Sequence, residues 1–285
     1  MNRNEPSQQM DPVRGPYPTV SLITTASWSL PDELALCRRL GISRISLPAH
    51  KAARTGWAET ASLTGESGVA VECIAHGNTA DPDDGRGWAG ELATLDAAVT
   101  GAANLGAKTV LFTTGPSGRL SWEDAADRLI HRISPVAERA RGLGVRLAVE
   151  NTMQMRSDIS FVHSVRDAAV IARRMNIGMI VDLYCAFQEP DLIATLRSEL
   201  DRVQIVQVSD FRVRTLSVPN RWVPGDGDLP MERLLREVID LGYNRAVEVE
   251  ILGPAIEEEG PEKALRRAVS WLSNQLPVDV RTKSW

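Results

Sequence analysis

The sequence predicts a single α/β domain folded as a (β/α)₈ barrel, and three observations support this prediction. The 285 residues, with a mass of 31.2 kDa, suit a fold that commonly runs to about 250 residues in one unit. From Val20 onward, short β-rich runs alternate with longer helical patterns, which is typical of a parallel sheet. The first strand is followed by TTASW at 24–28, which contains no glycine. A doubly wound open sheet, the alternative fold, usually has a glycine-rich turn there.

In the first half of the chain, helix signals separate the predicted strands. Pro31 opens a helical pattern that Gly41 closes, and both residues are favoured at these positions. A second long helical pattern ends at Gly106. The predicted strands are 20–24, 42–47, 69–75 and 109–113, and the helices between them are 31–40, 57–66 and 88–105.

The second half repeats this rhythm. Ser121 is a suitable N-cap for a helix that runs to Gly142 or Gly144. The predicted strands are 145–150, 177–182, 203–208 and 246–251, and the later helices are 165–175, 192–200, 231–241 and 261–276. No change in composition marks a second domain. We therefore expect a flexible N-terminal arm at 1–18, the barrel at 19–277 and a C-terminal tail at 278–285.

The composition excludes several classes of function. The 32 basic and 37 acidic residues give a formal charge of −5, which argues against nucleic acid or an anionic membrane as the main partner. No run of 18 apolar residues occurs, and the proline-rich N-terminus lacks the apolar segment of a signal peptide. The cysteines, Cys37, Cys73 and Cys185, are too widely spaced for a disulfide framework. We expect a cytoplasmic enzyme that acts on a small molecule.

Acidic residues stand at the ends of the later strands, where the active sites of barrels lie. Glu150 ends the fifth predicted strand, Asp182 the sixth, and Glu248 or Glu250 the eighth. Three dry, unpaired carboxylates at one mouth repel one another, and a divalent cation removes that repulsion. The alternative is that these acids cap helices or pair with arginines on the rim. The set as a whole favours the cation.

Short motifs at these strand ends form a set typical of one family. They are LAVEN at 147–151, IVD at 180–182, VQVSD at 206–210, PGDGD at 224–228, GYN at 242–244 and VEVE at 247–250. With these motifs the chain resembles the xylose isomerase-like barrels, the sugar phosphate isomerase/epimerase group that also includes endonuclease IV. The resemblance covers nearly the whole barrel and is most specific after residue 145.

The resemblance implies a metal site made of Glu150, Asp182, Gln207 and Glu250. Strand alternation supports Glu250 over Glu248, because the two share a face and Glu250 lies nearer the mouth. Gln207 stands where the family normally has a histidine, and its amide oxygen can still coordinate a metal. An all-oxygen site suits Mn²⁺ first, with Mg²⁺ or Co²⁺ as alternatives. An all-oxygen site argues against an endonuclease IV, because a resemblance to that enzyme implies three zinc ions and many histidines.

Further residues are expected to bind the substrate at the mouth: Trp28, His76, Cys185 and Arg212. Cys185 stands where the family often has a histidine that contacts the substrate. It is either a small buried residue that fills space or a catalytic thiol. His76 could instead have a structural role. Arg212 could instead be a solvated arginine on the rim of the barrel. Arg156 replaces a glutamate that epimerases of free sugars often carry, which favours an anionic substrate.

In the epimerase branch, the resemblance implies that Glu150 and Glu250 act as acid and base on opposite faces of the substrate. The expected function is a divalent-metal-dependent isomerase or epimerase that acts on a keto-polyol, sugar or cyclitol through an enediolate. Two alternatives stay open. One is a metal-dependent dehydratase of a dehydroshikimate- or inosose-like keto compound, and the other is a non-catalytic barrel that serves as a binding or partner subunit. We also expect a homo-oligomer, because relatives are often dimers or tetramers.

Overall fold

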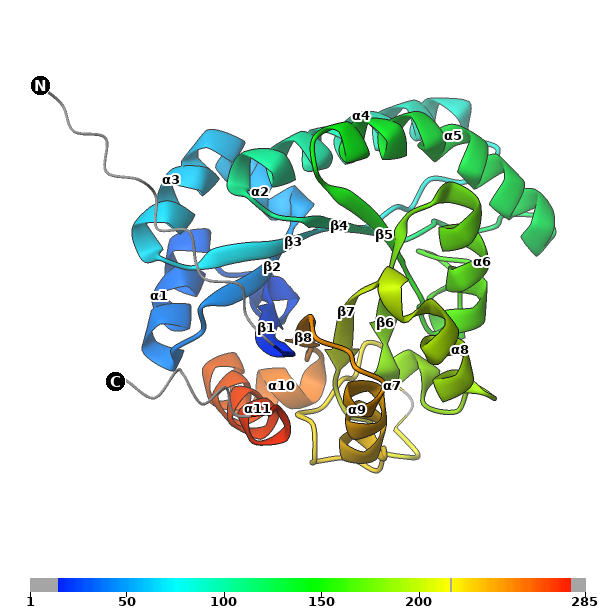
Figure 1. Cartoon of the computed structure of the whole chain (residues 1–285). Helices are drawn as coiled ribbons and strands as arrows, with labels where there is room; N and C mark the ends of the chain where they lie inside the picture. The colour runs from blue at the N-terminus through cyan, green and yellow to red at the C-terminus, as the bar shows by residue number, and fades with distance from the viewer. Residues whose placement is uncertain (1–14, 216, 278–285) are drawn as a thin grey trace, which may run out of the picture.

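The structure, a computed structural model, describes residues 15–215 and 217–277. Eight parallel strands close into a barrel in the sequence order β1 to β8, and β8 pairs with β1. Helices surround the strands on the outside of the barrel (Figure 1). The predicted (β/α)₈ fold is therefore confirmed.

The eight strands lie close to their predicted positions. They are β1 Tyr17–Ser21, β2 Arg44–Pro48, β3 Ala70–His76, β4 Thr109–Phe112, β5 Arg146–Glu150, β6 Gly178–Asp182, β7 Val203–Val208 and β8 Ala246–Val249. The largest shift is in β1, which begins at Tyr17 rather than Val20. Tyr17 and Pro18 therefore belong to the barrel and not to the expected arm at 1–18. Residues 1–14 of that arm and the expected tail at 278–285 lie outside the described residues.

The helices include all those predicted and three short ones that were not, namely α2, α7 and α10. Their bounds are α1 Leu30–Leu40, α2 Ala49–Thr55, α3 Trp57–Ser67, α4 Gly85–Leu105, α5 Trp122–Gly142, α6 Val165–Met175, α7 Leu183–Ala186, α8 Leu192–Glu199, α9 Met231–Asp240, α10 Pro254–Glu259 and α11 Pro261–Gln275. Single 3₁₀ turns occur at η1 Leu22–Thr25, η2 Gln154–Arg156 and η3 Leu200–Arg202. Among the described residues, no helix is long and apolar enough to cross a membrane.

Local sequence signals explain where the main helices begin and end. The Ser29 hydroxyl accepts a hydrogen bond from the Asp32 backbone N–H at 3.3 Å, which caps the first turn of α1. Gly41 ends α1 with a φ of 68°, a conformation that glycine adopts at no steric cost. The Ser121 hydroxyl caps α5 in the same way, at 3.1 Å from the Asp124 nitrogen. These caps and the terminal glycine fix the ends of α1, which follows β1, and the start of α5, which follows β4.

The inside of the barrel is filled by an apolar layer. It consists of Cys73, Leu111, Ala148, Ile180, Ile205 and Ala246. Because side chains alternate along a strand, the residue two positions further on faces the same interior, one layer nearer the C-terminal mouth. On β5 to β8 those residues are Glu150, Asp182, Gln207 and Glu248. The polar residues of the later strands therefore rest directly on a packed apolar floor.

Candidate active site

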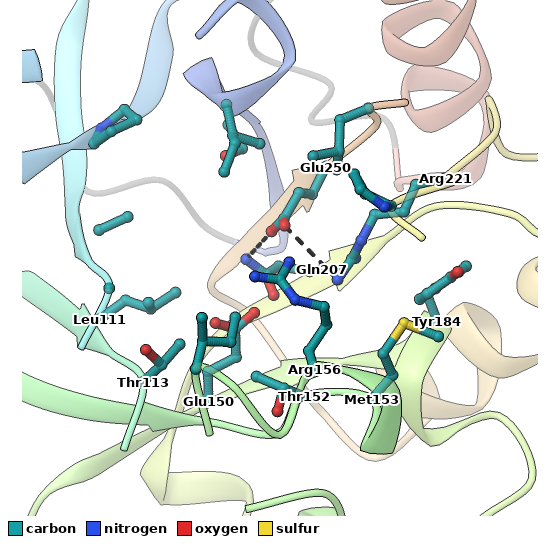
Figure 2. Close-up of a pocket in the computed structure, with 18 of the residues that line it drawn as sticks. Leu111, Thr113, Glu150, Thr152, Met153, Arg156, Tyr184, Gln207, Arg221 and Glu250 are labelled. Atoms are coloured by element: carbon teal, nitrogen blue, oxygen red, sulfur yellow. Dashed lines mark hydrogen bonds and ion pairs between the residues drawn. The ribbon is translucent and has the colours of Figure 1, made fainter. Parts of the chain in front are cut away.

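A cavity of about 250 Å³ opens at the C-terminal mouth of the barrel. Its polar lining includes Glu150, Gln207, Arg221, Glu248 and Glu250, several of which Figure 2 shows converging on one space. Its apolar walls include Ile23, Leu111, Met153, Ile159 and Leu252. The cavity is therefore polar at the strand ends and apolar along much of its wall.

The four predicted metal ligands come from four consecutive strand ends. Glu150 ends β5, Asp182 ends β6, Gln207 lies in β7 and Glu250 directly follows β8. Asp182 is 0% exposed, Gln207 1% and Glu150 7%. Glu150, Gln207 and Glu250 line the cavity, whereas Asp182 lies behind its wall. The strand-end argument thus brings together three buried polar side chains and Glu250, whose side chain is 12% exposed.

Arg221 lies between two of these carboxylates and was missed by the sequence reasoning. Its Nη2 donates to Asp182 Oδ2 at 2.7 Å. The same nitrogen lies 3.8 Å from Glu250 Oε1 (Figure 2). Its guanidinium carbon lies 4.6 Å from the centre of the Tyr184 ring. The backbone N–H of Arg221 donates to the Leu252 carbonyl at 2.8 Å, which ties this loop to the segment after β8. The several carboxylates at the strand ends predict that a cation lies among them. They do not indicate that Arg221 is that cation.

The carboxyl groups of the site are electrostatically linked. Burial raises the pKa of Glu150 well above its ordinary value, and the charges of Glu250 and Asp182 raise it further. Burial likewise raises the pKa of Glu250, although Arg221 opposes this. For Arg221, burial acts to lower the pKa, but the charges of Asp182 and Glu250 outweigh it and hold the pKa well above its ordinary value. Arg221 is therefore a permanent cation among buried acids.

Gln207 is hydrogen-bonded to two acids. Its Nε2 donates to Glu248 Oε1 at 3.0 Å and also to Glu250 Oε2. Gln207 Oε1 and Glu248 Oε2 are buried and have no hydrogen-bond partner among the described residues. Burial, followed by the charge of Glu250, raises the pKa of Glu248 to about 8. The sequence reasoning set Glu248 aside in favour of Glu250, whereas both line the cavity.

Cys185 contacts the site from behind. Its thiol donates to Asp182 Oδ2 at 2.9 Å, and its Sγ lies 3.8 Å from Arg221 Nη2. Burial, followed by the charge of Asp182, raises the pKa of Cys185 well above its ordinary value. A thiol that stays protonated is a donor rather than a nucleophile. Cys185 does not line the cavity and contacts Asp182 instead, so its binding of substrate stays a prediction.

His76 lines the cavity at the end of β3, as expected. Its Nε2 lies 3.2 Å from Glu91 Oε2 on α4, and this hydrogen bond is the first cause of a lowered pKa for Glu91. The carboxylate fixes the orientation of the ring. His50 also lines the cavity, from the start of α2.

Two expected substrate contacts are not found at the cavity. Trp28 packs against the hydrophobic core from the turn before α1 and does not line the cavity. Arg212 stacks 4.0 Å over the Trp222 ring and donates from Nε to the Asp226 carbonyl at 3.0 Å. Packing and loop contacts use both side chains outside the cavity, and their roles in substrate binding stay predictions.

Arg156 lines the cavity from η2, beyond the end of β5. Its Nε and Nη2 donate to the two carboxylate oxygens of Asp158 at 2.9 and 3.1 Å. Asp158 is itself largely exposed, with 62% of its side chain accessible. Arg156 thus places a positive charge on the wall of the cavity. Water screens its ion pair with the exposed Asp158.

The donor set of the site fits a hard divalent cation in kind. In the parts of the chain that the structure describes, no three His, Cys, Asp or Glu side chains gather closely enough to hold a metal ion by themselves. Gln207 adds an amide oxygen to the carboxylates, since its buried Oε1 has no partner among the described residues. Burial and then the neighbouring acid charges raise the pKa of Glu150, and a cation would offset the effect of those charges. Carboxylate and amide oxygens are the ligands that Mn²⁺ and Mg²⁺ prefer.

The fold is a (β/α)₈ barrel, and the site is a group of polar residues at the ends of its last four strands. The active sites of barrel enzymes lie at this end of the strands. The sequence model described as "Xylose isomerase-like TIM barrel" matches residues 32–275. The chain belongs to this family, and the resemblance inferred from its motifs is confirmed.

Characterised relatives share about half of the chain. An inosose isomerase of Halalkalibacterium halodurans is 23% identical over 143 residues, which are 49% of this chain and 51% of the relative. A fructoselysine 3-epimerase of Shigella flexneri is 23% identical over 156 residues, which are 54% of this chain and 55% of the relative. The chain spans about half the length of these relatives. A crystal structure of an IolI protein with a bound zinc atom superposes with a TM-score of 0.75 at 16% identity and covers 90% of this chain and 97% of its own, which shows the fold alone.

Proposed function

We propose that the protein is a divalent-metal-dependent isomerase or epimerase that moves a proton at the carbon next to the carbonyl of a keto-polyol, sugar or cyclitol. The observation that carries the proposal is that Glu150 and Glu250 reach one cavity from different walls, with Gln207 between them (Figure 2). The relatives with an inosose isomerase and an epimerase activity support this class of reaction.

The chemistry requires a base for the proton and a means of holding negative charge on oxygen. One of the two glutamates removes the proton and leaves the enediolate of the substrate. The other, or the same one, returns a proton to carbon. Return on the opposite face gives epimerisation, which is why two carboxyl groups on different walls suit this reaction.

Glu150, Asp182, Gln207 and Glu250 would hold the cation, with Mn²⁺ first and Mg²⁺ or Co²⁺ as alternatives. When bound, it would supply Lewis-acid stabilisation of the developing negative oxygen. Arg221, positioned by Asp182 and Tyr184, offers a guanidinium donor to a substrate oxygen. His76, oriented by Glu91, offers its other ring nitrogen to a hydroxyl. The relative with a bound zinc atom supports a divalent metal without fixing its identity.

The wall of the cavity favours an anionic substrate. A guanidinium pairs well with a carboxylate or a phosphate, and Arg156 is present on the wall. Its partner Asp158 is exposed, and an exposed ion pair is weak, about 0–1 kcal/mol, so a substrate anion competes with it. Test compounds therefore include neutral and anionic members.

Solvent deuterium exchange tests the proposal. The protein, loaded with Mn²⁺ in D₂O, is mixed with ketoses, ketose phosphates, inososes and dehydroshikimate, and proton NMR follows the carbon next to the carbonyl. We expect exchange in at least one compound. Glu150→Gln and Glu250→Gln each lower it at least about a hundredfold, because each removes an acid–base group. Glu66→Gln, at an exposed position on α3, leaves it unchanged.

Two results would count against this proposal. Exchange that survives in both Glu150→Gln and Glu250→Gln contradicts the acid–base roles. A conjugated product that absorbs in the ultraviolet, formed with loss of water, assigns the protein to the dehydratases instead.

A further inference from the structure

Gln207 is held in one orientation by its neighbours on β8. Gln207 and Glu248 are partners in the register of β7 and β8, so their side chains stand side by side inside the barrel. Gln207 Nε2 donates to Glu248 Oε1 at 3.0 Å and to Glu250 Oε2. Both Gln207 and Glu248 are 1% exposed, so water does not compete for these hydrogen bonds.

The same contacts determine where the amide oxygen of Gln207 points. The nitrogen and the oxygen of an amide lie in one plane and point in different directions from the carbon that bears them, so the position of Oε1 is fixed once Nε2 donates to Glu248 and Glu250. Oε1 is buried and has no partner among the described residues. An unpartnered buried oxygen destabilises the folded protein, and this cost is recovered when the oxygen binds a ligand. Glu248 accepts through Oε1 whether or not its Oε2 carries a proton.

We propose that Glu248 is a positioning residue that aims Gln207 Oε1 at the divalent cation. The inference rests on the proposed function, because it concerns the ligand set of that site. A histidine ligand is usually oriented by a hydrogen bond from its second ring nitrogen to a carboxylate or a carbonyl. The Gln207 amide has one nitrogen and one oxygen. Glu248 accepts a hydrogen bond from the nitrogen, which leaves the oxygen available to bind the cation. Glu248 itself does not contact the ion.

A double-mutant cycle on metal affinity tests this role, with calorimetric titration of MnCl₂ as the readout and no substrate present. Glu248→Leu removes the acceptor, and we expect Mn²⁺ to bind about tenfold to a hundredfold more weakly. Glu248→Gln has also lost the charge but keeps an acceptor oxygen, so it binds Mn²⁺ within a few-fold of the native protein. In the Gln207→Leu background, Glu248→Leu has little further effect, because no amide remains to be oriented.

Several outcomes would overturn the proposal. One is equal affinity of the native protein and Glu248→Leu, another is an equal loss in both backgrounds, and a third is equal loss in Glu248→Gln and Glu248→Leu. Absence of Mn²⁺ binding by the native protein would overturn it as well. If Glu248→Leu does not fold, Glu248→Met, which is longer and also lacks a strong acceptor, takes its place in the cycle. The proposed reaction fails separately, by the absence of deuterium exchange in protein that binds Mn²⁺ normally.

Discussion

At the scale of single residues, the strand ends were predictable and the side chains between them were not. Glu150, Asp182 and Gln207 are polar residues at or near the ends of apolar strands, so their convergence at the mouth followed from the barrel fold. Arg221 comes from the loop between β7 and α9, where no periodicity tells which side chain turns inward. Its place depends on backbone pairing with Leu252, far along the chain.

The buried charge of Arg221 makes a testable contribution to stability. Arg221→Gln leaves the buried Asp182 carboxylate without its cation, and losing one partner of a buried pair costs about 3–5 kcal/mol. We expect a loss of about 3 kcal/mol in the free energy of unfolding with EDTA at pH 7. Added Mn²⁺ restores part of it, because ligand binding stabilises the folded state. Urea unfolding with EDTA and with MnCl₂ measures both effects.

The matched control is Arg212→Gln, in the same loop but exposed and stacked on Trp222. We expect a smaller loss that Mn²⁺ does not alter. An Arg221→Gln protein as stable as the native one in EDTA would show that Asp182 does not need this cation.

At the scale of elements, helices with caps were predicted and very short ones were missed. The missed helices α2, α7 and α10 have 7, 4 and 6 residues, which is too few to display a helical period. The loop that carries Gly225 and Asp226 was noticed as a motif, but its anchoring was not. Arg267 on α11 pairs with Asp226 Oδ2 at 2.6 Å and with Glu259 Oε2 at 2.7 Å.

This network predicts a dependence of stability on pH. Hydrogen bonds from Arg267 are the first cause of a lowered pKa for both Asp226 and Glu259. A lowered folded-state pKa stabilises the protein above the ordinary carboxyl pKa, about 4, and this contribution is lost as the pH falls below that value. We expect Arg267→Gln to cost about 1 kcal/mol at pH 7, since the groups are partly exposed, and less at pH 3. Urea unfolding at the two pH values measures the difference.

Arg266→Gln is the matched control, because Arg266 forms an exposed pair with Glu262 one turn away on the same helix. Its loss at pH 7 is expected to be smaller than that of Arg267→Gln. Equal losses from the two substitutions, or a loss for Arg267→Gln that does not shrink in acid, would show that the network does not anchor the loop.

At the scale of the whole molecule, eight strand–helix units made the barrel predictable, and closure of the barrel gave the site its location. The apolar layer of Ala148, Ile180, Ile205 and Ala246 sets the depth at which the polar residues stand. That layer follows from alternation alone, once the strands are correct. The expected homo-oligomer and cytoplasmic location stay predictions, because they depend on surfaces and context that these strand patterns do not encode.

The central claim is that this mouth holds a divalent cation between residues of β5, β6, β7 and the segment after β8. Anomalous diffraction from crystals of the native protein grown with MnCl₂ tests it most directly. The account predicts one manganese peak that contacts oxygens of Glu150, Asp182, Gln207 and Glu250. A map with no manganese peak at these residues under saturating MnCl₂, and with Arg221 alone between Asp182 and Glu250, would contradict it.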